Sequence, residues 1–383
     1  MIEPAFFYDT LVQYGTDFFT GVPDSLLKSF CAYITDHTEG HRHIIPANEG
    51  AAVALACGYH LATGKIPLVY MQNSGIGNAV NPLLSLADPE VYHIPLLLLI
   101  GWRGEPGTTD EPQHFKQGKV TGALLEAMGI PAVILGDTKA AVSRQLASIY
   151  HELAQTKAPY ALIVRKDTFA SYTLHKTEAS PGGMSREEAI EEILRSSDPE
   201  TLFFSTTGMT SRELYELRDR CRMGHERDFL TLGSMGHASQ IALAVALHQP
   251  KRLVTCLDGD GAALMHLGAL AIIGTQKQVP NFRHILLNNG AHDSVGGQPT
   301  VALQIDLLAI ARACGYKGVY SASTRDALRA WVEAKQEGPT FIEVRVRKGA
   351  RKDLGRPRSS PEENKQALMA VLKERNKGTN ERI

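Results

Sequence analysis

The residues with the clearest potential for chemistry are an aspartate and an asparagine, each of which follows an apolar run. Asp260 is the centre of a Gly-Asp-Gly motif, and Asn289 closes an Asn-Asn pair. Residues 262–287, 26 in all, separate the two motifs. This length suits a helix that connects two parallel strands, whose carboxyl ends meet at one edge of a sheet. We therefore expect both side chains to lie close together, and converging carboxylate and amide oxygens suit Mg²⁺.

Glu49 is a second candidate, because it lies at the end of a predicted strand and in the first turn of a helix rich in small residues. The helix is expected to end at Gly64, since glycine readily adopts the left-handed conformation that terminates helices. An acid in the first turn can simply complement the helix dipole. That alternative stays open on the pattern alone.

The loop 102–114 follows the apolar strand 94–101 and contains further reactive side chains. It is rich in glycine, proline and charge, and it is longer than most connections. Arg103, Asp110 and His114 could bind a ligand or transfer a proton. A solvated surface loop explains any one of them equally well.

Two other segments are suited to support a ligand. Thr207 and Gly208 lie between a predicted strand and a predicted helix, where free backbone N–H groups favour an anion. Gly233, Ser234 and Met235 precede an amphipathic helix. A buried methionine usually serves core packing, so this segment has no assigned chemistry on its own.

Strands and helices must position all of these residues. Short apolar runs alternate with helical patterns in both halves of the chain, which is typical of an α/β fold with a parallel sheet. The 383 residues exceed a single core, and residues 167–184 lose the periodicity and gain Ser, Thr, Pro and Gly. We predict two doubly wound parallel-sheet domains with these bounds: N-terminal domain 1–166, linker 167–184, C-terminal domain 185–370 and tail 371–383.

Local patterns give three further expectations that the structure can test. The apolar run 263–274 predicts one continuous helix, and the Gly-rich segment 73–78 predicts a loop. Ser185 and Glu188 have the spacing of a capping box at the start of a helix.

Composition argues against several classes of function. The formal net charge of -1 gives no electrostatic reason to expect nucleic acid or an anionic membrane as a partner. The 5 cysteines are scattered and form no CxxC pair, so they are expected to be core residues in a reducing compartment. The first residues show no secretion signal, and no apolar run is long enough for a bilayer. We therefore expect a cytoplasmic protein.

The Gly-Asp-Gly motif, its spacing and the Asn-Asn pair together resemble the cofactor motif of the thiamine diphosphate-dependent decarboxylases and synthases. The resemblance implies thiamine diphosphate and Mg²⁺ as cofactors. It also implies a pyrimidine-binding N-terminal domain and a diphosphate-binding C-terminal domain. In this family Asp260 and Asn289 would supply side-chain oxygens to Mg²⁺, and Ala291 its backbone carbonyl. Gly259 and Gly261 flank the aspartate.

The same resemblance assigns roles to the other candidates. Glu49 would hydrogen-bond N1′ of the aminopyrimidine and so activate the cofactor, which carries the chemistry. Met235 would support the bent cofactor, which is a proximity effect. Contacts to the cofactor are further implied for Thr207, Gly208, Gly233 and Ser234.

Within this family the chain is most similar to the enzymes that decarboxylate 3-phosphonopyruvate, and next to those that act on sulfopyruvate. The segments that carry this resemblance are 18–28, 48–65, 70–86, 100–114, 205–214, 233–239, 259–261, 288–300 and 351–357. The implied reaction gives phosphonoacetaldehyde and CO₂ in phosphonate biosynthesis. Two alternatives remain: decarboxylation of sulfopyruvate or another 2-keto acid, and a scaffold subunit that retains the fold without catalysis.

The implied reaction needs groups that move a proton and groups that bind an anion. His114 and His292 are the candidates for proton transfer, since imidazole titrates near neutral pH; Asp110 and Asp293 are further candidates. Binding of the substrate is assigned to five residues: Arg103, Asp293, Arg351, Lys352 and Arg356. The cations among them suit a phosphonate, because a guanidinium pairs with a tetrahedral oxyanion through two N–H groups.

The expected site is divided along the chain. Glu49 belongs to the N-terminal domain, whereas Asp260 and Asn289 belong to the C-terminal domain. A single cofactor must therefore contact both domains, and in families like this one the contact crosses between subunits. The sequence thus favours a homodimer or a higher homo-oligomer.

Overall fold

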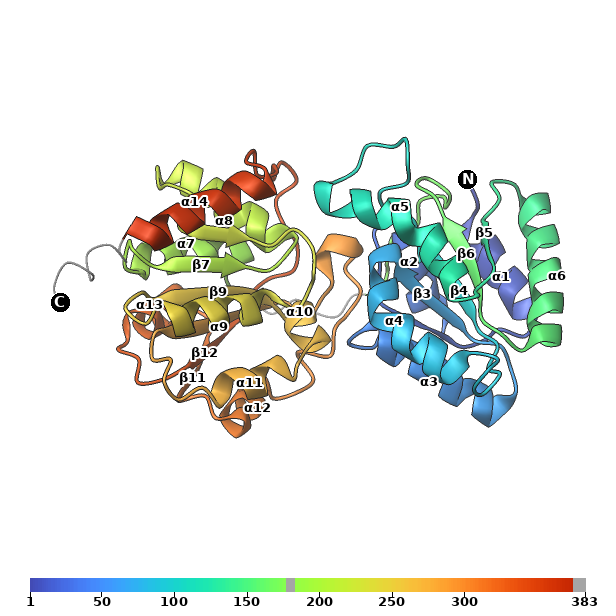
Figure 1. Ribbon diagram of the computed structural model, residues 1–383, viewed down its shortest axis with the longest axis horizontal. Helices are drawn as coiled ribbons and strands as arrows, with labels where there is room; N and C mark the ends of the chain where they lie inside the picture. The colour runs from blue at the N-terminus through green and yellow to red at the C-terminus, as the bar shows by residue number, and fades with distance from the viewer. Residues whose placement is uncertain (177–182, 375–383) are drawn as a thin grey trace. The chain divides into compact units, whose positions relative to one another are not determined.

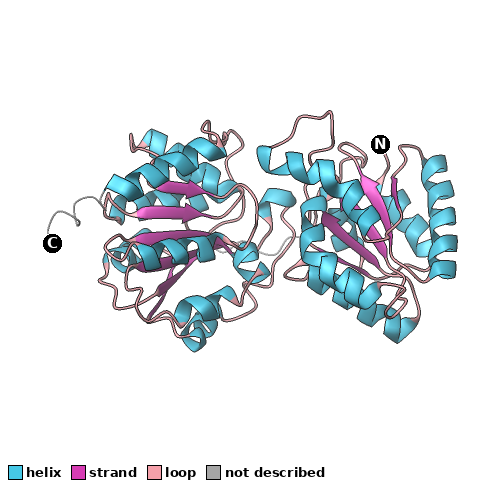
Figure 2. Cartoon of the chain, in the orientation of Figure 1, coloured by secondary structure: helices cyan, strands magenta, loops and turns pink. Residues whose placement is uncertain are grey.

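The computed structural model describes residues 1–176 and 183–374, which form two compact units (Figure 1). The first unit contains the N-terminal range together with Ser294–Gln298, and the second contains the remaining described residues. In each unit helices cover both faces of a central sheet (Figure 2). The predicted fold class, two parallel-sheet α/β domains, is confirmed.

The sheet of the first unit has 6 parallel strands in the order β2-β1-β3-β4-β6-β5. Their bounds are β1 Phe19–Gly21, β2 His43–Ile44, β3 Leu68–Gln72, β4 Leu97–Gly101, β5 Ala132–Ile134 and β6 Tyr160–Val164. The helices are α1 Pro4–Gln13, α2 Lys28–His37, α3 Glu49–Thr63, α4 Ile76–Pro82, α5 Pro112–Ala127 and α6 Lys139–Thr156. Because neighbouring strands run parallel, all their carboxyl ends lie at one edge of this sheet.

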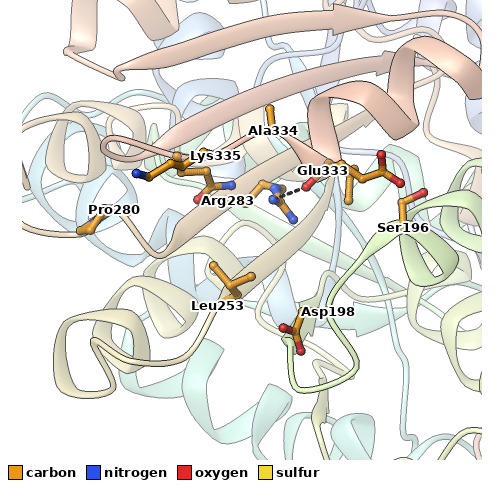
Figure 3. Close-up of a pocket in the computed structure, with 10 residues that line it drawn as sticks. Ser196, Asp198, Leu253, Pro280, Arg283, Glu333, Ala334 and Lys335 are labelled. Atoms are coloured by element: carbon orange, nitrogen blue, oxygen red, sulfur yellow. Dashed lines mark hydrogen bonds between the residues drawn. The ribbon is translucent and has the colours of Figure 1, made fainter.

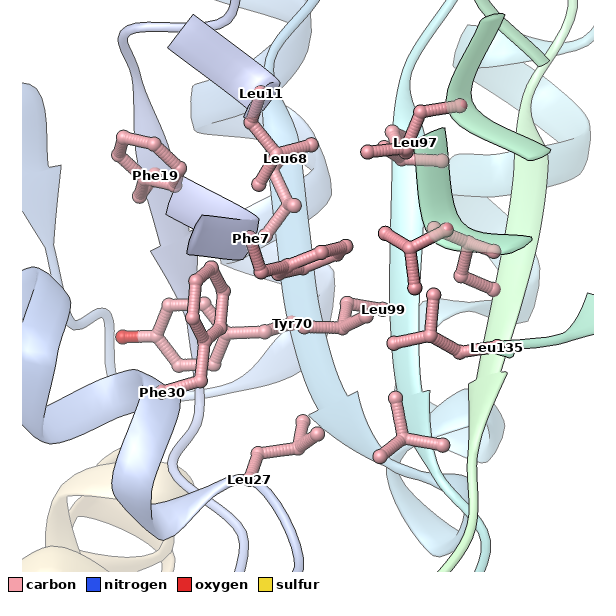
Figure 4. Packing of buried hydrophobic residues seen from close by; sticks show 14 of the residues in the cluster. Phe7, Leu11, Phe19, Leu27, Phe30, Leu68, Tyr70, Leu97, Leu99 and Leu135 are labelled. Carbon is pink, nitrogen blue, oxygen red and sulfur yellow. The ribbon is translucent and has the colours of Figure 1, made fainter. Parts of the chain in front are cut away.

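Alternation along the strands divides the core of this unit into two layers. Leu68 and Tyr70 pack on one face against α1, α2 and α6, where they join Phe7 and Phe30 (Figure 4). Val69 belongs to the cluster on the other face, with residues of α3, α4 and α5. Successive side chains of a strand point to opposite faces, so a continuous apolar run is what a sheet covered on both faces requires.

The second unit repeats this plan with strand order β11-β12-β10-β9-β7-β8. Its strands are β7 Leu202–Ser205, β8 Asp228–Leu230, β9 Val254–Gly259, β10 Phe282–Asn288, β11 Gly318–Ala322 and β12 Thr340–Arg345. Its helices are α7 Arg186–Ser196, α8 Met209–Arg220, α9 Ala238–His248, α10 Asp260–Met265, α11 Ala269–Gly274, α12 Leu307–Cys314, α13 Arg325–Glu333 and α14 Pro361–Glu374. One core layer holds residues of α7, α8 and α13, and the other holds residues of α9, α11, α12 and α14.

Of the local predictions for helix starts, helix ends and loops, some are confirmed and others are wrong. The capping box of Ser185 and Glu188 is confirmed, and Gly64 ends α3 with a φ of 71°. The single helix predicted over 263–274 is wrong, because the chain leaves helical geometry at His266 and resumes it after Gly268. Gly268 itself keeps a helical φ of -57° and ψ of -20°, so the break lies at His266, with a φ of -131° and ψ of 52°.

The segment 73–78 is also not a loop. It forms a 3-10 turn, Asn73–Gly75, that leads directly into α4. In the tail, α14 continues to residue 374, whereas 375–383 and the part 177–182 of the predicted linker lie outside the described residues. Within the described ranges, no helix combines the length and the apolar character that crossing a membrane would require.

Candidate active site

Reactive side chains gather at the carboxyl edge of the first sheet, because a loop or helix start follows each strand there. Asp24 follows β1, Glu49 follows β2, and Asn78 lies in the helix after β3. Arg103 comes directly after β4. The segment after β3 links these groups, since the backbone of Arg103 exchanges hydrogen bonds with the side-chain amide of Asn73 at 2.8 and 3.1 Å.

Glu49 lies at the first position of α3, and its buried carboxyl group has a hydrogen-bond partner in the helix after β3. Its Oε2 accepts a hydrogen bond of 2.7 Å from Nδ2 of Asn78. Burial raises the pKa of Glu49 above its usual value, although the hydrogen bond from Asn78 opposes that effect. A carboxyl group that keeps its proton is both a hydrogen-bond donor and an acceptor. In its protonated form Glu49 can donate a hydrogen bond to a ring nitrogen.

Gly75 forms the wall beside this carboxyl. A Cβ atom at position 75 would overlap the carboxyl group of Glu49, so only glycine fits there. Sequence analysis did not identify Gly75 or Asn78 as partners of Glu49. Both lie in the segment that was expected to be a loop, and only the fold brings it against the start of α3.

Arg103 is held in a defined position by a carboxylate and a hydroxyl. Its Nε donates to Oδ2 of Asp110 at 2.8 Å, Nη2 donates to the other carboxylate oxygen, and Nη1 donates to Oγ of Ser25 at 2.7 Å. Burial alone would raise the pKa of Asp110, but the hydrogen bonds from Arg103 and from two backbone N–H groups bring it well below its usual range. The pair is therefore ionised, with the guanidinium 19% exposed.

His114 lies in the first turn of α5 and is almost fully buried. Burial lowers its pKa to about 4, and the positive charge of Arg103 acts in the same direction. The ring is therefore neutral near pH 7. Its Nδ1 has no hydrogen-bond partner among the described residues, so it is available to accept or hold a proton.

Asp24 is a further acid at this edge of the sheet, in the turn between β1 and α2. Its Oδ2 accepts the backbone N–H of Leu26 at 2.8 Å. The carboxyl packs against Gly101, and its Oδ1 has no partner within the described part of the chain. Burial raises its pKa to about 6, while Arg103 opposes the shift. The signal that could have identified it is an acid directly after an apolar strand.

At the carboxyl edge of the second sheet, the structure brings Asp260 and Asn289 together. Leu287 at the end of β10 pairs with Gly259 at the end of β9, and the backbone N–H of Asn289 contacts the Asp260 carboxylate. Thr300 donates its hydroxyl to Oδ2 of Asp260. Burial raises the pKa of Asp260 to about 6, as expected for a buried carboxylate that no cation contacts among residues 1–176 and 183–374.

Ala291, whose backbone carbonyl is the third predicted metal ligand, lies beside Asn289. Its N–H donates to Oδ1 of Asn289 at 3.0 Å, so the residue lies next to the amide oxygen. A carboxylate, an amide oxygen and a backbone carbonyl are the ligand types that Mg²⁺ prefers. The donor set therefore fits Mg²⁺ and, through it, a diphosphate.

The other predicted cofactor contacts surround this edge. Gly208 has a φ of 91° and precedes α8, and Thr207 donates to the carbonyl of Leu232 at 2.6 Å. Ser234 adopts a φ of 53°, which is unusual for a residue other than glycine, and it follows Gly233 in the loop after β8. Such strained backbone occurs mostly where a ligand or a tight turn requires it.

Met235, Gly261 and His292 pack against one another. A Cβ atom at Gly261 would lie 2.9 Å from the His292 ring and 3.3 Å from Cε of Met235. Desolvation lowers the pKa of His292 to about 4, against the opposing effect of the Asp293 carboxylate. The neutral ring and the thioether therefore form a close-packed wall beside the Gly-Asp-Gly motif.

One of the cations predicted to bind substrate, Arg351, is already paired with carboxylates of the protein. Arg351 contacts three carboxylates: Nε and Nη1 lie 3.2 and 3.1 Å from Glu187 and Asp353, and Nη2 contacts Glu216. Lys352 and Arg356 are exposed in the segment after β12. Because Arg351 is already neutralised, its positive charge is poorly suited to bind a further anion.

A pocket of about 430 Å³ lies at the opposite, amino-terminal edge of the second sheet (Figure 3). The buried Arg283 donates to the backbone carbonyl of Val332 at 2.6 Å, near the end of α13. Burial lowers the pKa of Arg283 to about 10, and the negative end of the helix dipole compensates the charge. None of the predicted site residues lines this pocket.

Sequence comparisons identify relatives over nearly the whole chain. Residues 5–124 match the family described as thiamine pyrophosphate enzyme, N-terminal TPP binding domain, and residues 206–344 match the corresponding C-terminal TPP binding domain. A phosphonopyruvate decarboxylase of Streptomyces hygroscopicus is 36% identical over 371 residues, which covers 92% of this chain and 90% of that protein.

Two further relatives extend this similarity. A phosphonopyruvate decarboxylase of Streptomyces viridochromogenes is 35% identical over 380 residues, covering 95% of this chain and 93% of that protein. A sulfopyruvate decarboxylase of Methanosarcina acetivorans is 29% identical over 345 residues, covering 84% of each chain. The two family matches include Glu49 in the first range and both Asp260 and Asn289 in the second.

Proposed function

The chain belongs to the thiamine pyrophosphate-dependent decarboxylases, and we propose that its substrate is 3-phosphonopyruvate, which it converts to phosphonoacetaldehyde and CO₂ with Mg²⁺ as the metal. Thiamine pyrophosphate is the thiamine diphosphate expected from the sequence. The observation that carries the substrate assignment is the 36% identity, over 92% of the chain, to a protein named phosphonopyruvate decarboxylase. Phosphonate biosynthesis is the corresponding biological context.

The residues of the second unit support a diphosphate held through a metal. Asp260, Asn289 and Ala291 would bind Mg²⁺, and the start of α8 at Gly208 would offer N–H groups to the phosphate oxygens. The hydroxyl of Thr206 is buried and has no partner among the described residues, so it can donate to the same anion. Met235 would support the organic part of the cofactor by contact alone.

The residues of the first unit support the reaction itself. When bound, the cofactor supplies the electron sink that accepts the electron pair released as CO₂ leaves. Glu49 would donate its proton in a hydrogen bond to the aminopyrimidine nitrogen. His114, neutral near pH 7, can accept a proton at Nδ1 and return it to carbon. Asp24, whose raised pKa of about 6 lies near neutral pH, is a second group that can take up and return a proton.

We assign the phosphonate to Arg103 rather than to Arg351. Arg103 has one carboxylate partner and one neutral partner, Ser25, whereas Arg351 contacts three carboxylates. A guanidinium with an uncommitted N–H group can bind a dianion through charge-assisted hydrogen bonds. Ser25 can donate its hydroxyl proton to the same group.

The proposed substrate can be tested by measuring CO₂ release from purified protein with thiamine diphosphate and Mg²⁺. Phosphonopyruvate, sulfopyruvate and pyruvate are compared at equal concentrations. A higher kcat/KM for phosphonopyruvate than for the other two is the expected result. A preference for sulfopyruvate or pyruvate would leave the decarboxylase in place and overturn the substrate.

Arg103→Lys is expected to lower kcat/KM for phosphonopyruvate about 10- to 100-fold, the loss of one hydrogen bond to a charged group. Lysine can still pair with Asp110, but its single nitrogen cannot reproduce the separate N–H groups with which the guanidinium contacts Asp110, Ser25 and the substrate. Activity on pyruvate, which lacks the phosphonate, should change much less. Steady-state kinetics of Arg351→Lys provide the comparison. A larger loss of kcat/KM in that variant would mean that the segment after β12, and not Arg103, binds the phosphonate.

The active unit is proposed to be a homodimer or a larger homo-oligomer. A single cofactor must contact Glu49 in the first unit and Asp260 in the second, and subunit interfaces commonly unite such half-sites in symmetric oligomers. Sedimentation equilibrium of the purified protein should give at least twice the mass of the 41.8 kDa chain. A monomer that is fully active would contradict this proposal.

A further inference from the structure

We infer that Arg186 and Asp293 are positioning residues that fix the orientation of the Asn289 side chain, so that its oxygen rather than its nitrogen faces the metal. This inference rests on the proposed Mg²⁺ site and adds two residues to it. It also changes the role of Asp293, which the sequence placed among the groups that bind substrate or transfer protons.

The side-chain amide of Asn289 has two chemically different ends. Its Nδ2 donates to Oδ2 of Asp293 at 2.6 Å, and its Oδ1 accepts the N–H of Ala291 at 3.0 Å. Only the oxygen of an amide can bind Mg²⁺, and the two ends differ by a rotation of the amide group. An acceptor that holds the nitrogen therefore determines which end is presented to the metal.

Asp293 is itself held by donors from distant parts of the second unit. Its Oδ2 accepts from Nη1 of Arg186 at 3.1 Å and from the backbone N–H of Gly349 at 2.9 Å, in addition to Asn289. Three donors on Oδ2 leave that oxygen little capacity for proton transfer and fix the direction of the carboxylate toward Asn289. A carboxylate at this position would also repel an anionic substrate, so Asp293 is better suited to hold Asn289.

Arg186 provides the fixed end of this arrangement. Its Nε and Nη2 donate to the two carboxylate oxygens of Glu213 at 2.8 and 3.1 Å, and the side chains of Arg186 and Glu213 are 6% and 2% exposed. The guanidinium is planar, so the pairing with Glu213 on α8 also fixes the direction of Nη1 toward Asp293. An ammonium group could not serve both carboxylates with this geometry.

A structural role alone would not require Asp293. The pair of Arg186 and Glu213 already connects α7 and α8, and a connection between helices needs no third partner. Burying a guanidinium and two carboxylates together is costly. The additional contact from Asp293 to Asn289 gives this cluster a function at the metal site, in the way that outer-shell partners orient metal ligands.

The test is binding of Mn²⁺, as a spectroscopic substitute for Mg²⁺, in the presence of thiamine diphosphate and without substrate. Electron paramagnetic resonance of free Mn²⁺ gives the affinity of each purified full-length variant. Asp293→Ala is expected to weaken Mn²⁺ binding about 10- to 100-fold, the usual cost of losing an outer-shell partner. Asp293→Asn keeps an acceptor oxygen and should restore part of the affinity.

Arg186→Lys should weaken Mn²⁺ binding in the same direction, because lysine loses the two-sided geometry. Arg195→Lys is the matched control: Arg195 lies on the same helix and pairs with Glu191 at the surface, so its replacement should leave the affinity unchanged. In all variants, kcat at saturating metal and cofactor should stay within a few-fold of wild type. A positioning residue affects how well the metal binds, not the reaction once it is bound.

Several outcomes would overturn the inference. One is wild-type Mn²⁺ affinity in both Asp293→Ala and Arg186→Lys. Another is a large loss of kcat at saturating metal with unchanged Mn²⁺ affinity, which would mean that Asp293 contacts the substrate. If Asp293→Ala does not fold, Arg186→Lys decides alone. Absence of Mn²⁺ binding in the wild type would remove the metal site and this inference together, whereas a wrong substrate would leave the assay unaffected.

Discussion

Glu49→Gln is expected to lower kcat by about 10²- to 10⁴-fold, the usual contribution of a positioned acid–base group, while thiamine diphosphate still binds. Glutamine has the same shape, and its carbonyl oxygen can accept the hydrogen bond from Asn78 that Oε2 of Glu49 accepts at 2.7 Å. It cannot, however, share a proton with a ring nitrogen. Steady-state kinetics and calorimetric titration of the cofactor separate the two effects.

The same substitution should also stabilise the protein without cofactor. Burial raises the folded-state pKa of Glu49 above its usual value of 4.5, so ionisation of the carboxyl costs folding free energy. This group contributes its full stability below the usual pKa and loses it as the pH rises through the raised folded pKa. Glu49→Gln should therefore melt at a higher temperature than wild type at pH 8, and the difference should vanish near pH 4.

Glu126→Gln is the matched control for both measurements. Glu126 is exposed on α5, so its replacement should change neither kcat nor the melting temperature at pH 8. Wild-type turnover of Glu49→Gln at saturating cofactor would remove Glu49 from the catalytic site. Equal melting temperatures at pH 8 would mean that the carboxyl is solvated rather than buried.

The sequence was most informative where short-range patterns and parallel-sheet topology act together. The alternation of apolar runs and helices predicts both sheets, and the carboxyl ends of parallel strands must share one edge. That geometry explains why Asp260 and Asn289 were expected to meet across 26 intervening residues, and the register of β9 and β10 does place their strand ends in contact. The bounds assigned to the predicted domains remain expectations.

The partners of the site residues were not predictable in this way. Arg186 lies 27 residues from Glu213 and 107 residues from Asp293, and in the sequence it is only a charge at the start of a helix. Asn78 was likewise unassigned. Their contacts arise from the packing of loops and helix starts at a sheet edge, which no periodicity of the chain encodes.

The break between α10 and α11 has a similar origin. The run 263–274 is apolar enough for one helix, but intrinsic preference is a weak determinant that tertiary packing overrides. His266 directly follows α10, and its ring centroid lies 4.3 Å from that of His237, the residue before α9, with the two rings tilted by 52°. This contact couples the loop after β8, which carries Met235, to the helix that begins with Asp260.

Asp260→Asn should abolish metal-dependent binding of thiamine diphosphate, and with it the decarboxylation. The substitution preserves the size of the side chain and its contact with Thr300, but it removes the negative charge that a dication requires. The loss of metal affinity should exceed the roughly 10- to 100-fold effect of removing an outer-shell partner. Direct measurement of Mn²⁺ binding gives this number without reference to activity.

Without metal, the same variant should be more stable than wild type. Asp260 is buried and has no cationic partner among the described residues, and its pKa rises from 3.8 to about 6. Above pH 6 the ionised carboxylate therefore costs up to about 3 kcal/mol of unfolding free energy, and an amide at this position carries no such cost.

The measurement is the melting temperature at pH 8. Without ligand, Asp260→Asn should melt at a higher temperature than wild type. Addition of Mg²⁺ and cofactor should then reverse the order, because ligand binding stabilises only the protein that binds it. A variant that is destabilised without ligand and still stabilised by Mg²⁺ and cofactor would show that Asp260 serves the fold rather than the metal.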